Sequence, residues 1–88
     1  MSDQESLLTF PCEFPLKVMG PAAADFDAHV IGIIRRHIPD LREGAVSTRA
    51  SKGGRYLAVT VVITATSRAQ LDAIYIDLNR SERVTMVL

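Results

Sequence analysis

A pair of adjacent glycines at 53–54 separates two runs of β-branched and small residues, 45–52 and 55–66. Adjacent glycines adopt the positive φ angles that a two-residue primed turn requires, so this stretch predicts a β-hairpin. The pairing that keeps apolar residues on one face is Val46 with Val61, Thr48 with Val59, Ala50 with Leu57 and Lys52 with Arg55. A slip of one residue would exchange the two faces, so the turn and the hydrophobic pattern predict the same register.

The other face of this hairpin carries small or β-branched residues instead of the lysines and glutamates of a solvated surface. These residues are Ala45, Ser47, Ala58, Thr60, Val62 and Thr64. A semi-apolar sheet face is more often an interface than a bare surface, so we expect another subunit to cover it. The sequence therefore predicts a homodimer.

The chain before the hairpin contains one predicted strand and one predicted helix. Residues 14–20 alternate in polarity, which is typical of a half-buried strand. Pro15 falls at the start of this strand, where a missing N–H is tolerated. Gly20 and Pro21 then turn the chain, and apolar residues at helical spacing over 22–37 predict an amphipathic helix.

The chain after the hairpin contains a second predicted helix and a last strand. Ser67 and Gln70 fit a capping box, in which both side chains satisfy backbone donors at the start of a helix. The buried stripe predicted for this helix is Leu71, Ile74, Tyr75 and Leu78. Alternation over 82–88 predicts a strand with Val84, Met86 and Leu88 on one side and Arg83, Thr85 and Val87 on the other.

The order β-α-β-β-α-β, with two crossover connections, predicts an α+β fold of the ferredoxin-like class. Its sheet has four antiparallel strands, and both helices lie on one face. The 88 residues suit a single domain over 1–88, with residues 1–13 as an N-terminal lead-in.

Composition limits the function more than it defines it. Ten basic and ten acidic residues give a formal net charge of zero, so no overall field favours nucleic acid or an anionic membrane. The sequence contains no apolar run of about 20 residues and no signal peptide, so we expect a cytoplasmic protein without a membrane segment. A single cysteine agrees with a reducing compartment.

Several segments resemble those of the YbeD-like family of small bacterial proteins. They are Phe14-Pro15, Lys17-Val18-Met19-Gly20, Arg36-His37, Ser51-Lys52-Gly53 with Tyr56, and Val84-Thr85-Met86-Val87-Leu88. The resemblance covers nearly the whole chain. It implies a ferredoxin-like fold close to ACT regulatory domains, a cytosolic location and no established activity.

The corner after the first strand is a candidate ligand-binding site. Glycine at this corner would let a ligand approach backbone donors closely. The candidate residues are Lys17, Met19, Gly20 and Pro21. A small-molecule effector at this corner, or a protein partner on the open sheet face, would make the chain a non-catalytic regulatory or adaptor module.

The hairpin tip is a candidate site for a partner or an anion. It gathers Arg49, Lys52, Arg55 and Tyr56. Three interpretations stay open: the charges keep an exposed edge soluble, they bind an anion or an acidic partner surface, or they bind single-stranded RNA weakly with Tyr56 stacking on a base. Nucleic acid is the least expected of these partners.

No catalytic, metal or cofactor site is expected. His37 lies on the apolar stripe near a helix end, where a packed histidine and a ligand or pH-sensing group are both possible, whereas His29 should face solvent. Cys12 has no basic sequence neighbour that would lower its pKa. The chain has no metal-ligand spacing around the histidines and no nucleophile with a paired base.

Overall fold

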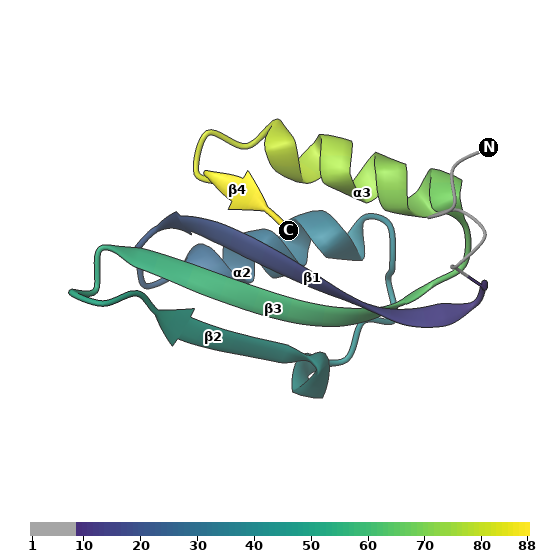
Figure 1. The fold of residues 1–88 in the computed structure, drawn as a ribbon, viewed down its shortest axis with the longest axis horizontal. Helices are drawn as coiled ribbons and strands as arrows, with labels where there is room; N and C mark the ends of the chain where they lie inside the picture. The colour runs from purple at the N-terminus through teal and green to yellow at the C-terminus, as the bar shows by residue number, and fades with distance from the viewer. Residues whose placement is uncertain (1–8) are drawn as a thin grey trace.

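The computed structural model of the chain describes residues 9–88 as one antiparallel sheet packed against two helices (Figure 1). The elements are β1 (Cys12–Pro21), α2 (Phe26–Arg35), the 3₁₀ helix η1 (Glu43–Ala45), β2 (Val46–Ala50), β3 (Tyr56–Ala65), α3 (Arg68–Asn79) and β4 (Met86–Val87). The strand order is β2-β3-β1-β4, and every neighbouring pair is antiparallel. The predicted ferredoxin-like α+β fold is confirmed.

Both helices cover the same face of the sheet, and the core lies between them and the strands. The buried hydrophobic residues from the strands are Leu16, Val18, Val59, Val61, Ile63 and Ala65, and those from the two helices are Phe26, Val30, Ile33, Ile34, Leu71, Ile74 and Leu78. Because the buried strand residues alternate along the chain, every second strand residue points to the opposite face. No helix of the described chain covers that face.

The hairpin has the predicted register but a different turn. Strands β2 and β3 pair Val46 with Val61 and Ala50 with Leu57, as expected. Instead of a two-residue turn, the Gly54 N–H donates to the Ser51 carbonyl at 2.8 Å, and the Ser51 hydroxyl accepts the Tyr56 N–H at 3.1 Å. Both glycines have positive φ, +88° and +73°. The turn therefore needs glycine at these two positions, as predicted, although the loop is longer than two residues.

The last strand departs from its prediction in length and in facing. Only Met86–Val87 form β4, because the Val84 N–H donates to the Ser81 carbonyl and this turn interrupts the alternation. Val84 and Val87 consequently pack against the core, while Met86 and Leu88 are exposed. The predicted grouping of Val84 with Met86 and Leu88 is therefore wrong.

Helix α2 is shorter than predicted, and strand β1 is longer. The strand continues to Pro21, and the Ala22 N–H still bonds the Arg55 carbonyl at 2.9 Å. Pro15 lies inside β1 and not at its start. The N–H of Lys17 donates to Leu88 at the β4 edge of the strand, and an N–H at position 15 would point to the same edge, beyond the end of β4. The strand therefore tolerates the missing N–H of Pro15.

The start of α3 is capped as predicted. The Ser67 hydroxyl accepts the Gln70 N–H at 3.0 Å, and the Gln70 side-chain oxygen accepts the Thr66 N–H at 2.8 Å. The lead-in predicted over residues 1–13 falls partly outside the described residues. Within the described part, Phe10 packs against the core, and Cys12 and Glu13 already belong to β1.

Candidate binding surface

The sheet face opposite the helices, called the open face below, collects most of the exposed large apolar side chains of residues 9–88. Four of the five lie on it: Tyr56, Val62, Met86 and Leu88, while Ile76 lies on α3. Met86 pairs with Met19, and Leu88 exchanges both backbone hydrogen bonds with Lys17. These contacts extend the open face to the β4 edge of the sheet. The alternation in the sequence had instead grouped Met86 and Leu88 with Val84.

The structure brings together most of the open-face residues expected from the hairpin. Ser47, Val62 and Thr64 are exposed, whereas Ala58 and Thr60 are half-buried. Ala45 is an exception, since it belongs to η1 and not to a strand of the sheet. The face thus carries small side chains and Val62 near its centre, and the larger Tyr56, Met86 and Leu88 toward its margins.

Three charged residues belong to the strands of the open face. Lys17 in β1 and Arg49 in β2 flank a shallow hollow of about 320 Å³, whose lining includes Ser47, Ala58 and Thr60. Glu13 is the only acidic residue within the four strands, and it faces the same side. None of the four ion pairs found within residues 9–88 involves these three side chains. They are therefore available to a partner.

The hairpin tip is exposed. Lys52 and Arg55 lie in the loop, and Tyr56 begins β3 with 47% of its surface exposed. Arg49 lies further along β2, on the open face. Binding of an anion or of single-stranded RNA at this tip stays a prediction, because no contact described here tests it.

The corner at Gly20 is closed by packing. Gly20 is buried, and a β-carbon there would collide with the Arg83 carbonyl oxygen and lie 2.6 and 2.7 Å from two carbons of the Phe26 ring. Lys17 and Pro21 are exposed and Met19 is half-buried. Ligand binding at this corner stays a prediction, and the packing supplies another reason for the glycine.

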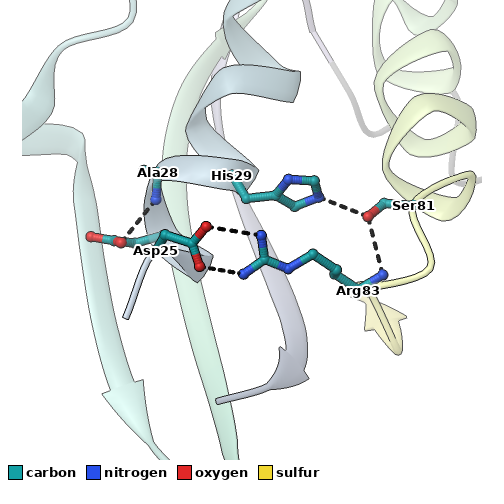
Figure 2. Close-up of polar contacts among 6 residues, drawn as sticks. Asp25, Ala28, His29, Ser81 and Arg83 are labelled. Carbon is teal, nitrogen blue, oxygen red and sulfur yellow. Dashed lines mark hydrogen bonds and ion pairs between the residues drawn. The ribbon is translucent and has the colours of Figure 1, made fainter. Parts of the chain in front are cut away.

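A polar cluster that the sequence did not reveal joins the start of α2 to the segment before β4 (Figure 2). Arg83 donates two hydrogen bonds to the Asp25 carboxylate, at 2.7 and 3.2 Å. These bonds and the positive charge of Arg83 lower the pKa of Asp25. The Ser81 hydroxyl accepts the Arg83 N–H at 3.2 Å and lies 2.7 Å from Nε2 of His29.

The placement of His29 corrects an expectation. Its ring was predicted to face solvent, but it is half-buried because the chain after α3 passes over it. The contact with Ser81 resembles a base beside a nucleophile, yet Asp25 bonds Arg83, and no carboxylate of residues 9–88 bonds the imidazole of His29. We therefore interpret the cluster as a structural link.

The second histidine links the turn after α2 to α3. Nε2 of His37 lies 2.9 Å from the Asp77 carboxylate of α3, and Arg36 approaches the same carboxylate at 3.4 Å. The hydrogen bond from His37 and the charges of both residues lower the pKa of Asp77. Asp77 is therefore part of a contact between α3 and the turn after α2, and not a solvated helix charge.

We expect acid to weaken this contact of Asp77. A lowered pKa means that the Asp77 carboxylate contributes stability above its ordinary value of 3.8 and loses it as the pH falls through the folded-state value. The Asp77→Asn variant should therefore be less stable than wild type near neutral pH, and the difference should shrink below that value. Urea unfolding at a series of pH values measures it.

Asp72→Asn is the matched control, because Asp72 forms only an exposed pair with Arg68 on the same helix. Its effect on the free energy of unfolding should be small at every pH. A gap between wild type and Asp77→Asn that stays constant as the pH falls would contradict the assignment.

Within residues 9–88, no group of three or more His, Cys, Asp or Glu side chains is placed to hold a metal ion. In the same part of the chain, no helix has the length and apolarity that crossing a membrane requires. Cys12 is a half-buried free thiol.

Comparison with known proteins defines the relatives of this chain. A family model described as "Protein of unknown function (DUF493)" matches residues 5–88. The chain belongs to this family. A UPF0250 protein of Chromobacterium violaceum is 49% identical to this DUF493 chain over the full length of both, and one of Pseudomonas paraeruginosa is 49% identical over 97% of this chain and 92% of its own.

Solved structures support the fold of this DUF493 protein. The solution structure of protein HP0495 from H. pylori superposes with a TM-score of 0.74 at 11% identity, covering 92% of this chain and 85% of that one. The ACT domain from GTP pyrophosphokinase of Chlorobium tepidum gives 0.65 at 14% identity, covering 86% and 84%. The resemblance noted in the sequence, to the YbeD-like family with a ferredoxin-like fold close to ACT domains, is thus confirmed.

Proposed function

We propose that this protein is a non-catalytic regulatory or adaptor module that acts in the cytoplasm as a homodimer, with a second copy seated on the open face. One observation carries the proposal: four of the five exposed large apolar side chains of residues 9–88 lie on this face. Burying them against a partner removes apolar surface from water, which favours association. The ACT-like fold supports a regulatory class.

The polar contacts support a binding role over catalysis. Both histidines and two of the carboxylates interact in contacts that join distant segments of the chain, as Asp25 does with Arg83 and Asp77 with His37. A small-molecule effector at the Gly20 corner stays a prediction. Because packing closes that corner on the side of Arg83 and Phe26, the proposal rests on the open face instead.

A charge at the centre of the open face should prevent dimerisation. Val62 is 38% exposed in the middle of β3, so Val62→Glu would place a carboxylate inside the interface at little cost to the monomer. We expect wild type to show a dimer mass by light scattering, and Val62→Glu to show a monomer with an unchanged circular dichroism spectrum.

Ile76→Glu is the matched control, because Ile76 is 57% exposed but lies on α3, away from the sheet. This variant should keep the dimer mass. A wild type that is monomeric at every concentration, or a Val62→Glu variant that remains a dimer, would overturn the proposal. In the first case, a search for a protein partner would follow.

A further inference from the structure

The charges of the open face are arranged along the strands in a way that specifies one alignment of two copies. Glu13 and Lys17 lie on β1, four residues apart, and both face the open side. At about 3.4 Å per residue their backbones are separated by about 14 Å, too far for an ion pair within one strand. Each charge therefore lacks a counterpart in its own sheet.

We propose that each Glu13 carboxylate pairs with Lys17 of a second copy, at the rim of the hollow between Lys17 and Arg49. This inference rests on the proposed dimer and specifies its geometry. The open faces of the two copies pack against each other, and the two-fold axis runs midway between them, perpendicular to the strands. This axis reverses the strand direction in the second copy. When the axis passes at Pro15, midway between the two residues, Glu13 of each copy lies over Lys17 of the other.

The residues at that midpoint suit a two-fold axis. Pro15 pairs with Val62 in the sheet, and both are uncharged and exposed. A residue on a two-fold axis meets its own copy, so a charged residue there would face a like charge. Moving the axis to the next row on this face would bring Lys17 against Lys17, which is unfavourable.

The hollow gives the incoming carboxylate a favourable setting. Lys17 and Arg49 supply positive charge from two sides, and the hydroxyls of Ser47 and Thr60 belong to the same lining. Ser47 and Thr60 are cross-strand partners, so their side chains lie next to each other. Packed sheets lie about 10 Å apart, a gap that a glutamate and a lysine side chain bridge together. The second copy thus contributes the acid that this face lacks near its two cations.

Two single charge reversals provide the test. In a dimer of the Glu13→Lys variant, the substituted side chain of each copy would face Lys17 of the other, and in a dimer of Lys17→Glu, each Glu13 would face a glutamate. We expect each variant alone to dimerise at least tenfold more weakly than wild type, as measured by light scattering or analytical ultracentrifugation. In an equimolar mixture, a heterodimer of the two variants replaces these repulsions with two lysine–glutamate pairs, so it should form with about wild-type affinity.

Lys52→Glu is the control, since it reverses a charge at the hairpin tip, outside the proposed pairs, and should leave the dimer intact. A mixture no more associated than its components would overturn this pairing, while a dimer that Val62→Glu still disrupts would leave the proposed function standing. A wild type that stays monomeric, with inorganic phosphate shifting the NMR signals of Lys17 and Arg49, would assign the hollow to a free anion instead.

Discussion

The Phe26→Ala variant is expected to lose about 3 to 5 kcal/mol of unfolding free energy, the range for removing a large aromatic ring from a core. Phe26 is fully buried at the first position of α2. Its ring lies next to Gly20, beside the position that a β-carbon of residue 20 would occupy. A chain of 88 residues has a total stability of about 4 to 13 kcal/mol, so the loss is a large part of the total. The variant should be partly unfolded at room temperature if the wild type lies at the low end.

Guanidinium unfolding followed by circular dichroism measures this loss, at one fixed protein concentration because dimerisation adds to apparent stability. Ile76→Ala is the control: Ile76 is exposed on α3, and its truncation should change the free energy by about 0.5 kcal/mol or less. A Phe26→Ala variant as stable as Ile76→Ala would show that the ring is not a core element.

The second large effect is expected from one added methyl group, in Gly20→Ala. The new carbon would overlap the Arg83 carbonyl oxygen and crowd the Phe26 ring. The carbonyl belongs to the backbone, so relief requires a shift of the segment that Arg83 ties to Asp25. We expect a loss of about 2 to 3 kcal/mol, the upper part of the range for overpacking.

Gly32→Ala is a control that makes the same chemical change but should raise the free energy of unfolding instead of lowering it. Gly32 is exposed within α2, and a β-carbon there meets no atom within 4 Å. Alanine in a helix interior is favoured over glycine by about 0.8 to 1 kcal/mol, so this variant should be more stable than wild type. Equal effects of the two substitutions on the denaturation midpoint would contradict the packing assigned to Gly20.

Local patterns in the sequence were sufficient for the register of the hairpin and for most of the open face. The register of β2 with β3 follows from alternation around Gly53 and Gly54, because a strand has only two faces and a slip exposes the core set. The start of α3 at Ser67 follows from its own capping residues. The same alternation correctly placed Ser47, Thr60 and Val62 on one face, because successive residues of a strand point to opposite sides of the sheet.

The tertiary structure alone decided what lies beyond these local repeats. The turn at Ser81 interrupts the alternation before β4, so Met86 and Leu88 join the open face. The contacts of Arg83 with Asp25 and of His29 with Ser81 join residues 58 and 52 positions apart. Periodicity reports only which side of its own element a residue occupies. Which distant element packs against that side depends on the folded chain, and this is the physical reason why these contacts could not be predicted from the sequence.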